Sequence, residues 1–327
     1  MERLPKVELH LHLDCSLSYA AVSRLAPHIP REEYDEEFIA PPQCASLADF
    51  LTRAPRGFQL MQTEDALRIV AEDVFEQLRA DKVIYAELRF APLLHTYQGL
   101  TAEAVVAAVD RATEECIRAT GIEAGLILCT LRHFSAEQSM ETARLVKQFA
   151  GSRVAALDIA GDEAGFPIDP HIPAYRFAIE NGLHRTAHAG EARGADSVWE
   201  TLKAFQPTRI GHGVRSTEDP ALVEHLRQKR IHLEVCPSSN VQTRAFPSYA
   251  EHCADELFRA GISMGINTDA RTITNVTLEQ EYARLREAFR WDDEEFVACN
   301  REALRAAFVD EATRARLLHL LSAPVAR

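Results

Sequence analysis

Two histidines separated by a single residue are the first feature of this sequence that could carry chemistry. They stand in the segment Val7-Glu8-Leu9-His10-Leu11-His12-Leu13-Asp14, whose alternation of apolar and polar residues predicts a β-strand. Residues two apart in a strand face the same side, so His10 and His12 present two imidazoles to one space, as a metal ion requires. Taken alone, the pair fits two hydrogen-bonded histidines equally well.

Three later segments carry polar residues that change this balance: His188-Ala189-Gly190-Glu191, Gly211-His212-Gly213 and Asn267-Thr268-Asp269. Three imidazole nitrogens and one carboxylate oxygen form a ligand set suited to Zn²⁺, with one position open for water. The predicted ligands are His10, His12, His188 and Asp269. The set contains no thiolate, and no lysine follows the fourth expected strand to bridge a second ion, so we predict one zinc per chain.

A repeated pattern of strands and helices must position these residues. Eight short apolar runs are the expected strands, over 7–14, 83–92, 122–132, 154–163, 184–191, 209–214, 232–239 and 262–270. Apolar residues at spacings of three and four predict helices between them, over 63–80, 101–120, 136–149, 220–229 and 249–260. Such alternation is typical of an α/β protein with a parallel sheet.

A closed ring explains the placing of the polar residues better than an open sheet does. An open sheet gathers its site at one switch point, whereas a barrel brings the C-terminal ends of all its strands together. Because polar residues follow six of the expected strands, we predict a single (β/α)₈ TIM barrel domain over residues 1–327. The long connection 15–79 predicts an inserted helical lid, although extra helices on the outer ring also fit. The tail after Phe289, with a helix start at Asp292, predicts closing C-terminal helices.

The ordered motifs are similar to those of the adenosine deaminase family of the amidohydrolase superfamily. The resemblance rests on the segments quoted above, on the extended form Arg209-Ile210-Gly211-His212-Gly213 and on Asp158-Ile159-Ala160-Gly161-Asp162-Glu163. It extends from about residue 4 to the C-terminus. It implies zinc-dependent hydrolytic deamination of an aminopurine nucleoside, with adenosine and 2′-deoxyadenosine as the preferred substrates and inosine or 2′-deoxyinosine plus ammonia as the products.

The resemblance also implies a role for each matching residue. Glu191 matches a proton shuttle that protonates purine nitrogen 1, and His212 matches a residue that orients the attacking hydroxide. Asp14 and Gly161 match substrate-binding positions, on the ribose side and at purine nitrogen 3, and His12 also faces the substrate. The chemistry suits these types, since zinc lowers the pKa of a bound water to roughly 7 and general acid–base help contributes roughly 10²–10⁴ in rate.

Two residues depart from the family pattern. Cys15 stands where the family usually has glycine, and Ala270 replaces an aspartate that contacts purine nitrogen 7. The second change removes a hydrogen bond worth roughly 0.5–1.5 kcal/mol net, for which Arg271, Asn275 or a water are the candidate replacements. Adenine and aminodeoxyfutalosine therefore remain alternative substrates, although the run Gly161-Asp162-Glu163 favours a nucleoside.

Two other classes of function are weighed against this one. Amide or phosphoester hydrolysis on the same barrel would normally require a second metal ion and a bridging lysine, which the sequence lacks. A catalytically silent purine-binding barrel would have no need of four metal ligands together with Glu191 and His212.

Other polar residues have less certain roles. Arg89 and Arg132 end the second and third expected strands, where they either orient Glu163 or Asp162 or form ordinary ion pairs between strands. His232 and Glu234 lie near the N-terminus of the seventh expected strand. Residues at the N-terminal face of a barrel usually serve stability. Cys236, in Cys236-Pro237-Ser238-Ser239-Asn240, is expected to be an inert support of the site.

Composition limits the partners. The formal net charge of −13 argues against a nucleic acid or an anionic membrane, and favours a small-molecule substrate. Seven scattered cysteines without a CxxC pair predict free thiols in a reducing cytoplasm. We see no signal-peptide h-region and no apolar run of about 18 residues, so neither export nor a membrane span is expected.

Overall fold

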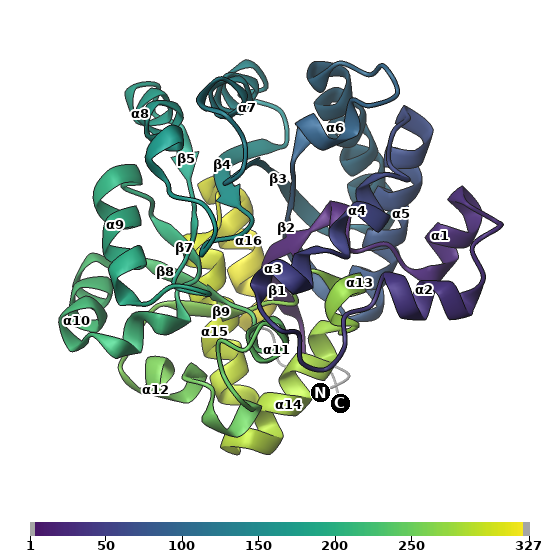
Figure 1. Ribbon diagram of the computed structural model, residues 1–327. Coiled ribbons are helices and arrows are strands. Elements are labelled where there is room, and N and C mark those ends of the chain that lie inside the picture. The colour runs from purple at the N-terminus through teal and green to yellow at the C-terminus, as the bar shows by residue number, and fades with distance from the viewer. Residues whose placement is uncertain (1–3, 323–327) are drawn as a thin grey trace.

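Parallel strands form the centre of the molecule in the computed structural model, which describes residues 4–322 (Figure 1). Five strands pair in chain order: β1 (Lys6–His12), β2 (Val83–Phe90), β3 (Glu123–Leu131), β4 (Val154–Ala160) and β5 (His184–Arg185). Four more form a second series: β6 (His188–Ala189), β7 (Arg209–His212), β8 (His232–Val235) and β9 (Met264–Ile266). Every pairing in both series is parallel. Strands of this kind are buried on both faces, which explains their apolar composition.

Residues 237–239, expected to end the strand over 232–239, instead begin the helix α11 (Pro237–Gln242). The expected strand over 184–191 is divided into β5 and β6. Between them the backbone changes partner: Thr186 N donates to Leu157 O (3.0 Å), and Ala187 O accepts from Gly211 N (2.9 Å). At the other end of the series, Asp269 exchanges two backbone hydrogen bonds with β1, at 2.8 and 3.0 Å. The arrangement is TIM-barrel-like, with helices outside the strands.

The crossover helices confirm most of the sequence pattern. The helices α5 (Glu64–Ala80), α6 (Ala102–Thr120), α7 (Ala136–Gln148) and α10 (Pro220–Lys229) lie within one residue of the expected ranges, and α8 (Ile172–Glu180) and α9 (Ala195–Phe205) complete the outer layer. The single helix expected over 249–260 is wrong. That segment is a 3₁₀ turn, η5 (Tyr249–Glu251), followed by α12 (Ala254–Arg259), because His252 between them is extended and its side chain is buried against Asn240.

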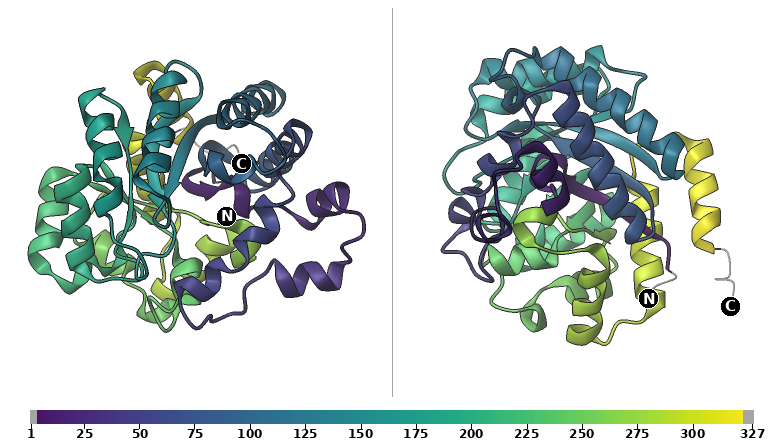
Figure 2. Two further views of the ribbon diagram at one scale, coloured as in Figure 1. Left: turned by 45° about the horizontal axis from the view of Figure 1, so that its top comes forward. Right: turned by 90° about the vertical axis from the view of Figure 1, so that its right-hand side faces the viewer.

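The connection after β1 is helical. It contains η1 (Leu13–Cys15), α1 (Tyr19–Leu25), α2 (Arg31–Glu37), α3 (Leu47–Leu51) and α4 (Ala54–Phe58). Figure 2 shows α1 and α2 standing out at one side of the molecule, whereas α3 and α4 lie close to β1 in Figure 1. Only the second pair lines the main cavity, through residues such as Phe50 and Phe58.

Short elements follow the strand ends, and longer helices close the chain. The short ones are η2 (Pro92–His95), η3 (Asp169–His171), η4 (Val214–Glu218), α11 (Pro237–Gln242) and α13 (Arg271–Thr274). The closing helices are α14 (Leu278–Phe289), α15 (Asp293–Ala306) and α16 (Glu311–Ser322). Asp292 caps α15 in a capping box, as its position in the sequence predicts. Leu317 and Leu321 of α16 pack with Val7 and Leu9, near the start of β1. Among the helices over 4–322, none has both the length and the apolar character needed to cross a membrane.

Candidate active site

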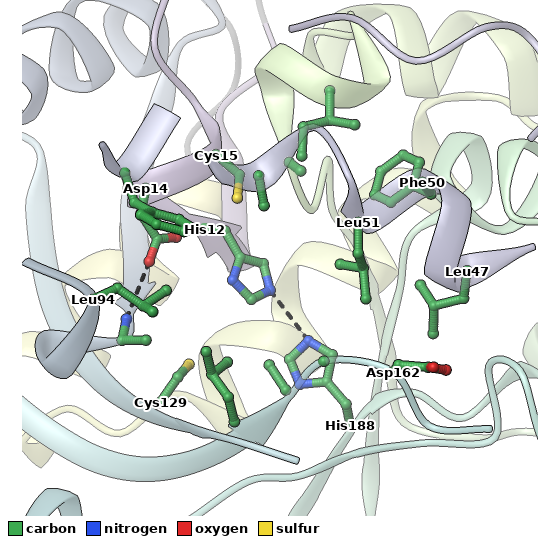
Figure 3. A pocket seen from close by; sticks show the side chains of 18 of the residues that line it. His12, Asp14, Cys15, Leu47, Phe50, Leu51, Leu94, Cys129, Asp162 and His188 are labelled. Atoms are coloured by element: carbon green, nitrogen blue, oxygen red, sulfur yellow. Dashed lines mark hydrogen bonds between the residues drawn. The ribbon is translucent and has the colours of Figure 1, made fainter. Parts of the chain in front are cut away.

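Four metal-ligating side chains converge at the C-terminal ends of the strands. They offer three imidazole nitrogens and one carboxylate oxygen within 4.8 Å of one another, from His10, His12, His188 and Asp269. The Nε2 atoms of His12 and His188 lie 3.2 Å apart (Figure 3), and Asp269 Oδ1 lies 3.4 Å from His12 Nε2. The fold thus brings together all four of the ligands predicted from the sequence.

The Nε2 atom of His10 tests whether this cluster fits a cation. It is buried, lies 3.3 Å from Asp269 Oδ1 and has no hydrogen-bond partner among the described residues. A buried polar atom without a partner is costly unless a ligand satisfies it. Imidazole nitrogens and one carboxylate oxygen are donors that Zn²⁺ accepts in catalytic sites, so these residues fit a zinc ion.

Backbone conformation turns the side chains into this space. Asp269 and His212 have φ angles of 66° and 60°, in the left-handed region that costs a residue with a side chain roughly 1–2 kcal/mol. Gly211 allows the close approach of two imidazoles, because a Cβ atom there would lie 2.9 Å from His10 Cε1 and 3.2 Å from His188 Cγ. A side chain at position 211 would therefore crowd the two imidazoles.

Two buried carboxylates orient the histidines from behind. Glu234 Oε2 accepts a hydrogen bond from His10 Nδ1 (2.9 Å), and Asp158 Oδ2 lies 3.1 Å from His188 Nδ1. A carboxylate accepts, so in both rings Nδ1 carries the proton and the Nε2 lone pair faces the cluster. Burial alone would raise the pKa of Asp158, but His188 and Arg89 beside it hold that pKa below its usual range.

The guanidinium of Arg89 joins these two carboxylates. It donates to Asp158 Oδ2 (2.7 Å) and to Glu234 Oε2 (2.6 Å), and also to the backbone carbonyl of Leu9 (2.6 Å). A second guanidinium, from Arg209, donates to the other oxygen of Glu234 (2.7 Å). All four charged side chains are buried, so the orientation of His10 and that of His188 depend on one network.

The structure decides between the alternatives left open for the two arginines. Arg89 forms ion pairs between strands, and its carboxylate partners are Asp158 and Glu234, not Glu163 or Asp162. Arg132 donates from Nη2 to the backbone carbonyl of His188 (2.9 Å). Glu234 has the structural role expected of it, since it pairs with Arg89 and Arg209, and its side chain also reaches the predicted metal ligand His10.

His232 lies at the start of β8, as expected, and its Nδ1 is 2.9 Å from Ser263 Oγ. The sequence pattern assigns no role to Asp158. The signal that could have identified it is a charged residue inside the apolar strand β4.

Glu163 holds the turn that carries Glu191. Its carboxylate accepts four backbone N–H groups, those of Gly190, Glu191, Ala192 and Arg193, at 2.7–3.0 Å. The hydroxyl of Ser197 adds a fifth hydrogen bond. Such a ring of donors fixes the backbone from which the Glu191 side chain projects.

Glu191 and His212 face each other across the cluster. Glu191 Oε2 lies 3.6 Å from His212 Nε2, and Glu191 Oε1 is buried with no hydrogen-bond partner among the described residues. Burial, with Asp269 and Glu163 nearby, raises the pKa of Glu191 well above its usual range. Burial lowers the pKa of His212. The pair therefore offers a carboxyl group whose protonated form is favoured and an imidazole whose neutral form is favoured.

Asp14 and Gly161 both line the cavity next to the cluster. Burial favours the neutral form of Asp14, but His95, 3.7 Å away, and the Ala91 N–H, at 3.1 Å, hold its pKa below the usual range (Figure 3). Gly161 has φ 102°, a conformation that favours glycine. Both residues line the cavity, and the substrate contacts expected of them stay predictions.

The cavity itself has a volume of about 450 Å³. His12, His188, Glu191, His212 and Asp269 all line it, together with a largely apolar wall. Figure 3 shows Leu47, Phe50 and Leu51 on one side, and Leu94 and Cys129 on the other. Phe58 and the 65% exposed Tyr97 also belong to its lining.

The two departures from the family pattern meet in this wall. Ala270 belongs to an apolar cluster with Leu47, Phe50 and Ile273, against which Cys15 packs. Two side chains were proposed to replace the missing aspartate, those of Arg271 and Asn275. Neither residue lines the cavity. Arg271 instead pairs with the buried carboxylates of Glu8 (2.6 Å) and Asp81 (2.7 Å).

Comparison with known proteins agrees with this geometry. The adenosine deaminase family model matches residues 5–324. An adenosine deaminase of Clostridium acetobutylicum is 34% identical over 325 residues, which cover 97% of each chain. The crystal structure of an adenine deaminase from Arthrobacter aurescens has a TM-score of 0.90 at 27% identity and 98% coverage of each chain. A Burkholderia ambifaria amidohydrolase with bound zinc shares the fold, with a TM-score of 0.88 at 23% identity, covering 98% of this chain and 90% of its own.

The family match, the sequence relatives and the adenine deaminase structure place the protein among the purine deaminases. Within that class, the chain belongs to the adenosine deaminase family, hydrolases that act on an amidine C–N bond of purines.

Substitution of Glu234 tests the carboxylate behind His10. Glu234→Gln keeps the size of the side chain but removes the charge that Arg89 and Arg209 balance. We expect zinc to bind roughly 10- to 100-fold more weakly, as is usual when a group behind a ligand is lost. Competition with a chelator of known zinc affinity measures this, with the exposed Glu224→Gln as the matched control. An affinity within about twofold of the parent protein would show that Glu234 does not support His10.

Proposed function

We propose that this protein hydrolyses the 6-amino group of an aminopurine nucleoside, with adenosine and 2′-deoxyadenosine as the preferred substrates and one zinc ion per chain. One observation carries the proposal. Three residues of the ligand cluster, His12, His188 and Asp269, line a single cavity together with Glu191 and His212, and His10 completes the cluster behind them. Bound zinc would supply a water of lowered pKa in that cavity.

Each side chain has a place in the proposed reaction. His10, His12, His188 and Asp269 hold the zinc ion, and the zinc found in the B. ambifaria amidohydrolase supports this choice. Glu191 donates a proton to purine nitrogen 1, which makes carbon 6 electrophilic, and later passes a proton to the leaving ammonia. His212 positions the attacking water. The reaction balances because the C–O bond to carbon 6 forms as the C–N bond breaks. Of the two water hydrogens, one replaces the proton that Glu191 gave to nitrogen 1, and the other leaves with the amino group as ammonia.

Substrate contacts complete the proposal. Asp14, an ionised carboxylate at the cavity wall, accepts hydrogen bonds from ribose hydroxyl groups. The backbone at Gly161 contacts purine nitrogen 3. His12 lines the cavity and contacts the bound purine beside the metal.

The surrounding architecture is part of the same proposal. The backbone hydrogen bonds between Asp269 and β1 support a closed (β/α)₈ barrel, and residues 1–327 would form one domain. Because α3 and α4 line the cavity, we assign the role of lid to them and not to α1 and α2. The seven free thiols support a cytoplasmic location.

A larger nucleoside is the second candidate substrate. The apolar part of the cavity wall, with Phe50, Phe58 and Leu94, suits an apolar substituent on the sugar, beyond the hydroxyl groups assigned to Asp14. Aminodeoxyfutalosine is a nucleoside of this kind. Free adenine, the substrate named for the A. aurescens structure, would leave Asp14 and this wall without a partner.

A substrate panel tests the proposed function. The panel compares kcat/KM for adenosine, 2′-deoxyadenosine, adenine and aminodeoxyfutalosine, by release of ammonia. We expect at least about a tenfold preference for a nucleoside over adenine, because a site with buried polar groups rejects a ligand that leaves them unpaired. Preference for adenine would contradict the nucleoside assignment. Preference for aminodeoxyfutalosine over adenosine would select the second candidate.

Ala270 gives a prediction about purine nitrogen 7. The cluster around Ala270 is apolar, so we expect the protein to discriminate little between adenosine and 7-deazaadenosine. Ala270→Asp should raise the relative kcat/KM for adenosine roughly two- to twelvefold, the range that one hydrogen bond contributes. Comparing the two proteins by this ratio cancels the difference in ring electronics between the substrates. If the ratio of kcat/KM for adenosine to that for 7-deazaadenosine is unchanged in a folded, zinc-loaded Ala270→Asp protein, purine nitrogen 7 does not lie beside residue 270.

Glu191 is tested by an isosteric amide. Glu191→Gln should keep zinc and the fold but lower kcat roughly 10²- to 10⁴-fold, because the amide cannot transfer a proton. The exposed Glu180→Gln is the control. A kcat within about tenfold of the parent value, on the best substrate of the panel, would mean that another group moves the proton.

A further inference from the structure

A chain of hydrogen bonds leads from a backbone amide on α12 to the imidazole of His212. The Ala254 N–H donates to His252 Nδ1 (3.1 Å), and His252 Nε2 lies 3.2 Å from Asn240 Oδ1. Asn240 Nδ2 then lies 3.0 Å from His212 Nδ1. The three side chains are all buried, with at most 3% of their surface exposed, so water has little access to any link.

The direction of every link follows from the first, because a backbone N–H can only donate. His252 Nδ1 must therefore be the nitrogen without hydrogen. Burial lowers the pKa of His252 to about 3, so the ring is neutral near pH 7 and its single N–H is at Nε2. That N–H donates to the oxygen of Asn240, which leaves the amide NH₂ of Asn240 to donate to His212 Nδ1.

His212 is thereby left with its own N–H at Nε2. This atom lies 3.6 Å from Glu191 Oε2 and belongs to a residue that lines the cavity. The reversed chain is excluded at its origin, since an N–H at His252 Nδ1 would face the N–H of Ala254. No charged side chain takes part in the chain, so its polarity does not depend on an ion pair.

We propose that Asn240 and His252 are positioning residues that fix His212 as the tautomer with hydrogen on Nε2, so that His212 enters the reaction as a hydrogen-bond donor. This inference rests on the proposed function. A donor at this point holds the oxygen of the attacking water and stabilises negative charge on it, but has no lone pair toward the cavity with which to take its proton. Of the two groups, only Glu191 can then transfer protons.

Nitrogen-15 NMR of histidine-labelled, zinc-loaded protein reads the tautomer directly, without substrate. The His212 resonances are assigned by their loss in His212→Gln. We expect Nδ1 to be bare and Nε2 protonated in the parent protein. In Asn240→Asp, an isosteric change that replaces the donor by an acceptor, we expect Nδ1 of His212 to carry a proton. Protonated Nδ1 in the parent protein, or bare Nδ1 in the Asp variant, would overturn the inference.

Kinetics then tests whether the tautomer matters. Asn240→Asp should lower kcat roughly 10²- to 10³-fold, the usual loss for one preorganised donor, with KM changed by no more than about threefold. His252→Gln, which keeps a donor toward Asn240, should retain more activity than His252→Phe. The control is Asn181→Asp, at the C-terminus of α8. A protonated Nδ1 with unchanged kcat would contradict the catalytic part of the inference. Because the NMR result needs no turnover, it stands apart from the substrate panel.

Discussion

The guanidinium of Arg89 lies between two buried carboxylates, and each carboxylate accepts a hydrogen bond from a different histidine of the cluster. Charges buried in this way are tolerated only when they are paired with good geometry. Loss of the pairing would leave Asp158 or Glu234 uncompensated in the interior. The same interaction that keeps the charges paired therefore also keeps two imidazole lone pairs aimed at one point, and the metal site depends on it.

Around this centre, the protein separates proton transfer from charge stabilisation. Glu191 is surrounded by other carboxylates and by apolar atoms, so its carboxyl group holds a proton at a pH where an exposed glutamate is ionised. Glu163, although close to it, accepts hydrogen bonds from four backbone N–H groups and fixes the turn. His212 is kept neutral by burial. The two neighbouring carboxyl groups, Glu191 and Glu163, thus have different roles because their surroundings differ.

The sequence was most informative where side chains repeat at strand ends. Spacing within a strand located His10 and His12, and the order of the motifs located His188 and Asp269, because strand ends of a parallel α/β fold meet. The partners of these residues were harder to find. Which carboxylate lies behind which histidine depends on how neighbouring strands are staggered, so the sequence does not reveal that Glu234 contacts His10 and Asp158 contacts His188. The break at His252 escaped the helical pattern because the buried hydrogen bonds of its side chain, with Asn240 and with the Ala254 N–H, leave no mark on the spacing of apolar residues.

The central claim is that three imidazoles and one carboxylate hold the ion. The arrangement contains a real alternative, since Cys236 Sγ lies within 4.8 Å of ligand atoms from His10, His212 and Asp269. Burial raises the pKa of this thiol well above its usual range, which disfavours a thiolate ligand. Zinc K-edge X-ray absorption of the loaded protein separates the two sets. We expect only nitrogen and oxygen neighbours at about 2.0–2.2 Å. A sulfur neighbour at about 2.3 Å would contradict the account.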